Sequence, residues 1–171
     1  MDLVPSNIDL AAAEIELTNE PGRERILAEK LAPVVDNYDF VLIDCPPSLG
    51  LLTLNALTAA TDVLIPVQTQ YFALRGLDLL FATIQKVKGR INPGLVIRGI
   101  LPTMVDTRTI HSREVLEELR NTYRQQICKT VIPQTIKIAD AQVAAQSIHS
   151  FAPNSPAAEA YRELAREVAG V

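Results

Sequence analysis

The stretch Asp39-Phe40-Val41-Leu42-Ile43-Asp44-Cys45-Pro46-Pro47-Ser48-Leu49-Gly50 carries the most information about the fold. Its first half is an apolar run with branched side chains, which is typical of a parallel strand buried on both faces. Asp44 ends the run, so we expect its carboxylate at the carboxyl edge of a sheet, where α/β proteins bind their ligands. Pro46 and Pro47 stiffen the chain beyond Asp44 and turn it off the sheet, which suits a loop that senses a phosphate.

A carboxylate at the position of Asp44 is expensive to desolvate unless a cation or hydrogen-bond donors face it. Mg²⁺, reached through a water molecule, is the natural partner beside nucleotide phosphates. An aspartate that caps the next helix, or that simply ends a strand, explains the residue equally well. From this segment alone, both interpretations stay open.

Further apolar runs and helical patterns alternate along the rest of the chain. The predicted strands are 39–44, 62–67, 95–101 and 129–133, and the predicted helices are about 22–35, 50–60, 74–91, 110–125, 137–146 and 155–169. This alternation with short connections predicts an α/β fold, a mostly parallel sheet flanked by helices on both faces. No repeat, linker or low-complexity tract interrupts the pattern, so we expect a single domain over residues 1–171.

The composition is that of a globular protein, with 171 residues, 48% of them hydrophobic and 21% charged. No apolar run approaches the length of a membrane span, and the first residues lack the pattern of a secretory signal. Cys45 and Cys128 are the only cysteines, too few and too scattered for a disulfide framework. We therefore expect a cytoplasmic protein without membrane attachment.

The net charge is −4, which by itself argues against nucleic-acid binding. Residues 86–137, however, carry ten basic and four acidic side chains, whereas the remainder carries six basic and sixteen acidic ones. Such clustering indicates either a solvated helix face or a surface that faces a polyanion.

Five segments, in order, resemble the ParA/Soj partition ATPases, which are relatives of MinD. Residues 38–50 resemble the second phosphate-site motif of that family. The others are Pro66-Val67-Gln68 with Tyr71, Leu74, Gly76 and Leu77; Thr103-Met104-Val105-Asp106-Thr107-Arg108-Thr109; Val131-Ile132-Pro133; and Pro153-Asn154-Ser155-Pro156-Ala157-Ala158-Glu159-Ala160-Tyr161-Arg162. Even residues 8–14 match the stretch that precedes these motifs. The resemblance covers nearly the whole chain and implies a fold like that of P-loop NTPases.

The resemblance also implies roles in nucleotide binding for individual residues. Asp44 would face Mg²⁺ through a water molecule, and Pro46 and Pro47 would form the switch loop. Met104 and Pro133 resemble the family's adenine pocket, although packing at the ends of two strands explains these residues equally well.

For DNA, the resemblance points to Arg108 and Lys137. Arg108 aligns with an arginine tied to sequence-independent DNA binding, and Lys137 matches another basic position of the family. A second DNA-contacting arginine of the family aligns with Gln134, which puts that contact in doubt. A solvated surface charge is the alternative for each basic residue. Further phosphate contacts could come from Arg98, Arg113, Arg120, Arg124 and Lys129.

Family members begin with a strand that leads into a K-G-G-x-G-K-T-type loop, followed by a strand that ends in D-x-D-P-Q. Neither motif occurs in these 171 residues. We therefore expect an amino-terminally truncated member with an incomplete sheet, no catalytic residue in the chain and no ATPase activity by itself. ATP and Mg²⁺ are the ligands of the intact family, and we expect this chain to hold them weakly at most. A truncated or mis-started gene, a split protein and a rearranged remnant are the three explanations.

Two functions follow from the resemblance. The first is a ParA-like partition protein that segregates chromosomes or plasmids. An intact member binds ATP between two subunits, coats the DNA of the nucleoid non-specifically and releases it when a ParB-like partner stimulates hydrolysis. The alternative is a non-catalytic interaction module, completed by another chain. A MinD-like membrane regulator would need a basic amphipathic tail, which residues 160–171 lack. The segment 103–109 argues against an amidotransferase-type synthetase.

Overall fold

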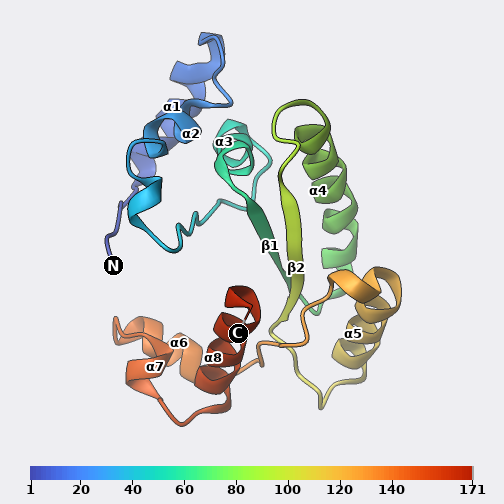
Figure 1. Ribbon diagram of the computed structural model, residues 1–171. Coiled ribbons are helices and arrows are strands. Elements are labelled where there is room, and N and C mark those ends of the chain that lie inside the picture. The colour runs from blue at the N-terminus through green and yellow to red at the C-terminus, as the bar shows by residue number, and fades with distance from the viewer. Residues whose placement is uncertain (171) are drawn as a thin grey trace. The chain divides into compact units, whose positions relative to one another are not determined.

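The computed structural model describes residues 1–170, except for the side chains of residues 71–75 (Figure 1). The family-like positions Tyr71 and Leu74 therefore have side chains outside the described part. Within residues 1–170, ten helices and strands follow one another as α1 (Ala12–Glu16), α2 (Ile26–Leu31), α3 (Leu51–Ala59), β1 (Asp62–Gln68), α4 (Tyr71–Arg90), β2 (Val96–Thr103), α5 (Ile110–Tyr123), α6 (Ile136–Val143), α7 (Ile148–Phe151) and α8 (Pro156–Ala169). Short 3-10 turns lie at Ile8–Ala11, Leu17–Asn19, Val35–Asn37 and Arg124–Gln126.

The chain divides into two compact units. The first comprises residues 1–61 and 79–96, and the second comprises residues 62–78 and 97–171. We describe each unit by itself, and the expectation of one domain stays a prediction. No helix among the described residues is long and apolar enough to cross a membrane.

The sheet lies in the second unit, where β1 and β2 pair as neighbours (Figure 1). The segment 127–134 runs parallel to β2, through bridges between Ile100 and Ile127 and between Val105 and Pro133. Backbone bonds join the two, among them Cys128 N–H to the Ile100 carbonyl at 2.8 Å and Ile132 N–H to the Pro102 carbonyl at 2.9 Å. The predicted α/β class with a parallel sheet flanked by helices is thus confirmed. The predicted strand 129–133 exists as a paired segment without regular strand geometry.

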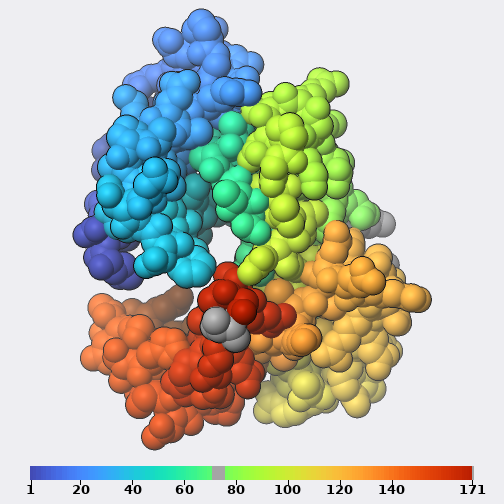
Figure 2. Space-filling model, viewed as in Figure 1, coloured from blue at the N-terminus to red at the C-terminus, as the bar shows by residue number. Residues whose placement is uncertain are grey.

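Apolar side chains from the paired segments and two helices form the core of the second unit. Ser155 caps the start of α8: its hydroxyl accepts the Ala158 N–H, and Pro156 stands in the first turn, as the sequence N-S-P predicts. Its inner face contributes Ala160, and its outer face lies at the molecular surface (Figure 2). The buried cluster comprises Leu101, Cys128, Ile132 and Ala160, covered by Leu64, Ile138 and Leu164.

In the first unit, the polar side chain of Asn55 joins α3 to the start of α2. Asn55 is 5% exposed, and its amide donates to the carbonyls of Arg23, at 2.8 Å, and Leu51, at 3.0 Å. Its side-chain oxygen accepts the N–H of Leu27 at 3.0 Å. α2 is much shorter than the predicted helix 22–35, because Gly22 turns with φ of +69° and Pro33 has no N–H to extend the helical ladder.

The prediction of a buried strand over 39–44 is wrong. This segment belongs to no strand, and its four apolar side chains, from Phe40 to Ile43, are between 36% and 87% exposed. An apolar run becomes a buried strand only where neighbouring strands take its backbone hydrogen bonds. Among the described residues of the first unit, no strand lies beside it. Asp44 therefore does not end a strand of the sheet.

Candidate functional site

In the first unit, the loop after Asp44 leads directly into α3. Residues 44–49 are exposed, and the Thr53 hydroxyl donates to the Ser48 carbonyl at 2.6 Å, which ties the end of the loop to the first turn of the helix. The Glu14 carboxylate accepts the N–H of Leu52 at 3.3 Å. Free backbone N–H groups at a helix start favour an anion. In this chain a carboxylate from α1 supplies it.

Asp44 is the carboxylate that the sequence predicts for a magnesium–nucleotide site. Mg²⁺ needs near-octahedral oxygen ligands, commonly one or two carboxylates together with substrate phosphates. No group of three or more His, Cys, Asp or Glu side chains among the described residues could hold a metal ion. The 171 residues also contain no glycine-rich loop with a following lysine to hold the phosphates. The roles of Asp44, Pro46 and Pro47 stay predictions.

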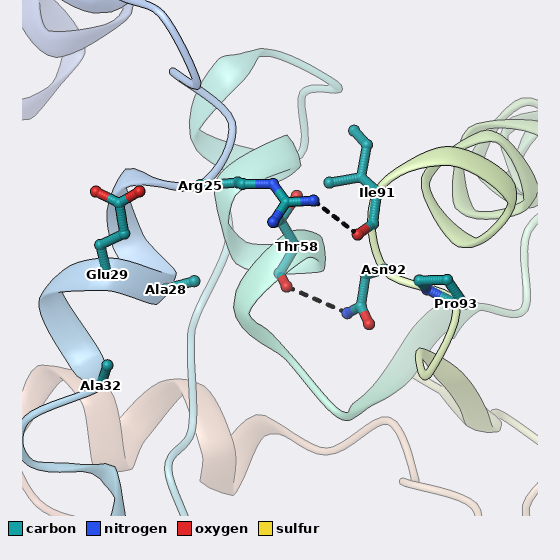
Figure 3. Close-up of a pocket in the computed structure, with 8 residues that line it drawn as sticks. All are labelled: Arg25, Ala28, Glu29, Ala32, Thr58, Ile91, Asn92 and Pro93. Atoms are coloured by element: carbon teal, nitrogen blue, oxygen red, sulfur yellow. Dashed lines mark hydrogen bonds between the residues drawn. The ribbon is translucent and has the colours of Figure 1, made fainter.

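A surface depression in the first unit is lined by residues of α2, the end of α3 and the segment after α4 (Figure 3). Asn92 donates there to the carbonyls of Leu57, Thr58 and Ala60, at 3.0, 3.2 and 2.7 Å, and so caps the carboxyl end of α3. Arg25 donates to the Ile91 carbonyl at 3.4 Å. These polar groups stabilise the unit itself, so the depression gives no sign of a ligand.

In the second unit, the structure brings together the two residues predicted for the nucleotide pocket. Met104 follows β2, and the next residue, Val105, bridges to Pro133. Val105 donates its N–H to the Ile132 carbonyl at 3.1 Å and accepts that of Gln134 at 3.0 Å. Met104 has φ of +52° and is 50% exposed. The two positions therefore sit side by side at the carboxyl ends of paired segments, and nucleotide binding there stays a prediction.

A chain of buried hydroxyl groups lies beneath this edge. Thr69, just after β1, and Ser112, in the first turn of α5, are 4% and 5% exposed. Their hydroxyl oxygens are 2.7 Å apart, and Thr69 also donates to the Met104 carbonyl at 3.2 Å. The Ser112 hydroxyl accepts the N–H of Asp106 at 3.1 Å. Each buried hydroxyl thus has partners, as buried polar groups require.

Asp106 in turn holds Arg108. The Arg108 guanidinium donates from Nε to Oδ1 at 2.9 Å and from Nη2 to Oδ2 at 2.8 Å, and the Arg108 backbone N–H donates to Oδ1 at 3.0 Å. These bonds lower the pKa of the Asp106 carboxyl to about 2. The Arg108 side chain is 86% exposed and that of Asp106 is 17% exposed. The predicted DNA-contacting arginine is therefore at the surface, with its guanidinium paired to Asp106.

Lys137 lies in the first turn of α6, where the Thr135 hydroxyl accepts its backbone N–H at 3.3 Å. Arg108 and Lys137 each follow, by three residues, one member of the hydrogen-bonded pair Val105 and Gln134. Both basic residues therefore emerge from the same edge of the sheet. Lys137 also lines a shallow depression with residues 151–155.

Comparisons with known proteins place this arrangement in a family. The family described as "AAA domain" matches residues 1–97. The chain is 46% identical over 169 residues to the sporulation initiation inhibitor protein Soj of Bacillus subtilis, covering 99% of this chain and 67% of Soj. It is 42% identical over 168 residues to the chromosome partitioning protein ParA of Myxococcus xanthus, covering 98% of this chain and 59% of that relative. The chain belongs to the ParA/Soj family.

A Mycobacterium tuberculosis protein is 53% identical to this chain over 168 residues. The match covers 98% of this chain and 53% of that protein, so the chain spans about half the length of this relative. Among solved structures, the cobyrinic acid a,c-diamide synthase of Mycobacterium smegmatis is 42% identical with a TM-score of 0.80, covering 96% of this chain and 62% of that one. McdA of Cyanothece, in complex with ATP, has a TM-score of 0.84 at 18% identity, over 99% of this chain and 66% of that one, and shows likeness of fold alone.

Sequence reasoning missed the residues that hold the ParA/Soj-type arginine in place. Asp106 stands two positions before Arg108, a spacing at which an aspartate carboxylate can accept a backbone N–H two residues on. Thr109 caps α5 through the Ser112 N–H, and the sequence T-x-x-S carries that signal too. Nothing in the sequence indicated Thr69, because 43 residues separate it from Ser112.

Proposed function

We propose that these 171 residues act in DNA partition as part of a ParA-type protein. The identity to Soj and ParA, 42–46% over nearly the full chain, carries this proposal. In the proposed role the chain is cytoplasmic and associated with the nucleoid, and it works with a ParB-like partner protein and as a homodimer.

The DNA contact would come from the basic edge of the second unit. Arg108 and Lys137 present exposed cations at one edge of the sheet, and cations attract the DNA backbone without reading its sequence. Arg98 is less suited to this contact, because its guanidinium donates to the Val168 carbonyl at 2.7 Å and so caps α8.

Fluorescence anisotropy with a labelled duplex of arbitrary sequence, recorded over a series of salt concentrations, tests this role. We expect DNA binding that weakens as the salt concentration rises. In the Arg108→Ala variant, the slope of the logarithm of the binding constant against the logarithm of the salt concentration should be smaller in magnitude by about one. Lys30→Ala is the matched control, because Lys30 is an exposed cation on α2, outside the basic stretch 86–137. Failure of the wild-type chain to bind at low salt, or equal effects of the two substitutions, would contradict the proposal.

We further propose that the chain by itself does not hydrolyse ATP. Phosphoryl transfer depends on positioning and charge neutralisation, and the 171 residues hold neither the K-G-G-x-G-K-T-type loop nor a D-x-D-P-Q segment. Phosphate release with ATP and Mg²⁺, with and without DNA, should equal that of an Asp44→Ala variant. Turnover by the wild-type chain that Asp44→Ala abolishes would overturn this part.

The exposed apolar segment 40–43 favours a second candidate function, an interaction module completed by another chain. An exposed apolar run without strand partners invites pairing with a strand of another chain. Hydrogen exchange of residues 39–44 should slow when the chain is mixed with a peptide that carries a K-G-G-x-G-K-T-type loop and the strand before it. A Leu42→Lys variant is the control, and unchanged exchange in the wild-type mixture argues against this candidate.

The likeness to the M. smegmatis protein named as a cobyrinic acid a,c-diamide synthase raises a synthetase as the competing chemistry. DNA binding that depends on Arg108 separates the two, because a synthetase of a small molecule has no need of a salt-dependent DNA contact.

A further inference from the structure

Arg108 is an exposed side chain with an unusually complete set of internal partners. Three hydrogen bonds from its guanidinium and backbone reach the same carboxylate, that of Asp106. Exposed ion pairs contribute little to stability, so the arrangement is a weak means of stabilising the fold. Its clearest consequence is that it fixes where the guanidinium points.

We propose that Asp106 is a positioning residue that holds Arg108 ready to contact a nucleic-acid phosphate, and that Ser112 and Thr69 anchor Asp106 to the interior. The inference rests on the proposed DNA-partition role and adds the residues that orient its central contact.

The geometry of the guanidinium allows a carboxylate and a phosphate to bind together. The group is planar and offers donors along two edges. The Nε–Nη2 edge faces Asp106, whereas Nη1 has no acceptor among the residues that the structure describes. Because the side chain is 86% exposed, its Nη1–Nη2 edge is open to a phosphate, which accepts two parallel N–H bonds well.

The anchor of Asp106 is buried and continuous. Its N–H donates to the Ser112 hydroxyl, which lies 2.7 Å from that of Thr69, and Thr69 donates to the Met104 carbonyl. The Asp106 carbonyl accepts from the Thr109 N–H, at 3.1 Å, and from its hydroxyl, also at 3.1 Å. These bonds join Asp106 to the segment after β1 and to the start of α5. A side chain held in its bound orientation loses less conformational freedom on binding, so its contact is stronger.

A charge effect alone predicts the opposite result, which makes the proposal testable. A carboxylate beside DNA repels phosphate, so its removal would tighten binding if it acted only through charge. If Asp106 positions Arg108, its removal weakens binding even though the protein becomes less negative.

The decisive experiment is a double-mutant cycle on DNA affinity, measured by anisotropy with the same labelled duplex. We expect Asp106→Ala to weaken binding about three- to tenfold in the wild-type background and to have no effect in an Arg108→Ala background. Asp106→Asn, which keeps an oxygen acceptor for the Arg108 N–H groups, should restore part of the loss. Glu118→Ala is the control for charge, since it removes an exposed carboxylate from α5, and it should leave binding unchanged or tighter.

Nitrogen NMR of the Arg108 Nε–H group reads the orientation without DNA. We expect slow solvent exchange in the wild-type protein, fast exchange in Asp106→Ala and intermediate exchange in Asp106→Asn. Tighter binding by Asp106→Ala, equal weakening in both backgrounds, or rapid exchange in the wild type would each overturn the inference. If Arg108→Ala alone leaves affinity unchanged, the DNA role of Arg108 fails and the inference falls with it. If Arg108→Ala weakens binding and Asp106→Ala does not, only the inference fails.

Discussion

The carboxylate of Glu14 in α1 occupies the space that a side chain on Gly50 would fill. From there it accepts the Leu52 N–H at the start of α3, at 3.3 Å. Glycine at position 50 therefore makes room for an internal anion at a helix start. α3 has no side-chain cap of its own, since Gly50 is its N-cap residue. A distant part of the chain supplies what the local sequence lacks.

Gly50→Ala should displace Glu14 and remove its interaction with α3. We expect a loss of about 0.5–1 kcal/mol in the free energy of unfolding, because a carboxylate at a helix start contributes about that much. Glu14→Ala should cost about the same, and the double variant no more than either alone, since both remove one interaction. Chemical denaturation followed by circular dichroism measures this, and additive losses would show that the two residues act separately.

Gly99 in β2 is another glycine whose position leaves no room for a side chain. A methyl group at this buried position would lie 2.5 Å from the Sγ atom of Cys128, which is too close for either atom. Gly99→Ala should therefore cost about 1–3 kcal/mol of unfolding free energy. Gly99→Ala combined with Cys128→Ala should be less destabilised than the sum of the single variants, because the sulfur is gone. If the double variant loses as much unfolding free energy as the two single variants together, or more, the contact between Gly99 and Cys128 is refuted.

Asn55→Ala should destabilise the first unit. The substitution removes three hydrogen bonds and leaves the Leu27 N–H and the Arg23 carbonyl without their partner, at a cost of about 1–3 kcal/mol. Asn121→Ala, at an exposed position of α5, is the control and should be nearly neutral. Thermal unfolding measures the difference, and equal melting temperatures for the two variants would contradict the role of Asn55.

The Asp106 carboxyl should titrate far below its ordinary pKa of 3.8. Hydrogen bonds from the Arg108 side chain and backbone lower its pKa to about 2, so the ionised form is favoured in the folded state. The stabilisation is fully present above the unfolded value and is lost as the pH falls through about 2. Carbon NMR of the side-chain carboxyl should show a midpoint near 2, moving toward the ordinary value in Arg108→Ala. A normal midpoint in the wild type would mean that the pair does not persist in solution.

The Cys128 thiol should resist alkylation in the folded protein. Burial, followed by the charge of Glu167, raises the pKa of Cys128 to about 11, so little thiolate exists at pH 8. Iodoacetamide with mass spectrometry should modify the exposed Cys45 first, and Cys128 only after denaturant is added. Rapid modification of Cys128 without denaturant would show that this part of the core opens readily.

Regular elements with their own local signals were predicted well. The strands 62–67 and 95–101 and the helices 50–60, 110–125 and 155–169 lie within about two residues of β1, β2, α3, α5 and α8. Each carries a pattern that neighbouring residues complete, such as the N-cap and proline of α8 or the apolar face of α5. The segment 39–44 has an equally strong apolar pattern, but a strand also needs a partner backbone, which its own residues cannot supply.

The sequence by itself determined the α/β class, the family and the positions of the basic residues, because these follow from local patterns and from motifs in order. The tertiary structure alone decided which residues meet. It placed Glu14 against Gly50, Thr69 against Ser112, and Met104 beside Pro133. The physical reason is that hydrogen bonds and steric fit act between groups far apart in the chain, whereas patterns in sequence record only what near neighbours share.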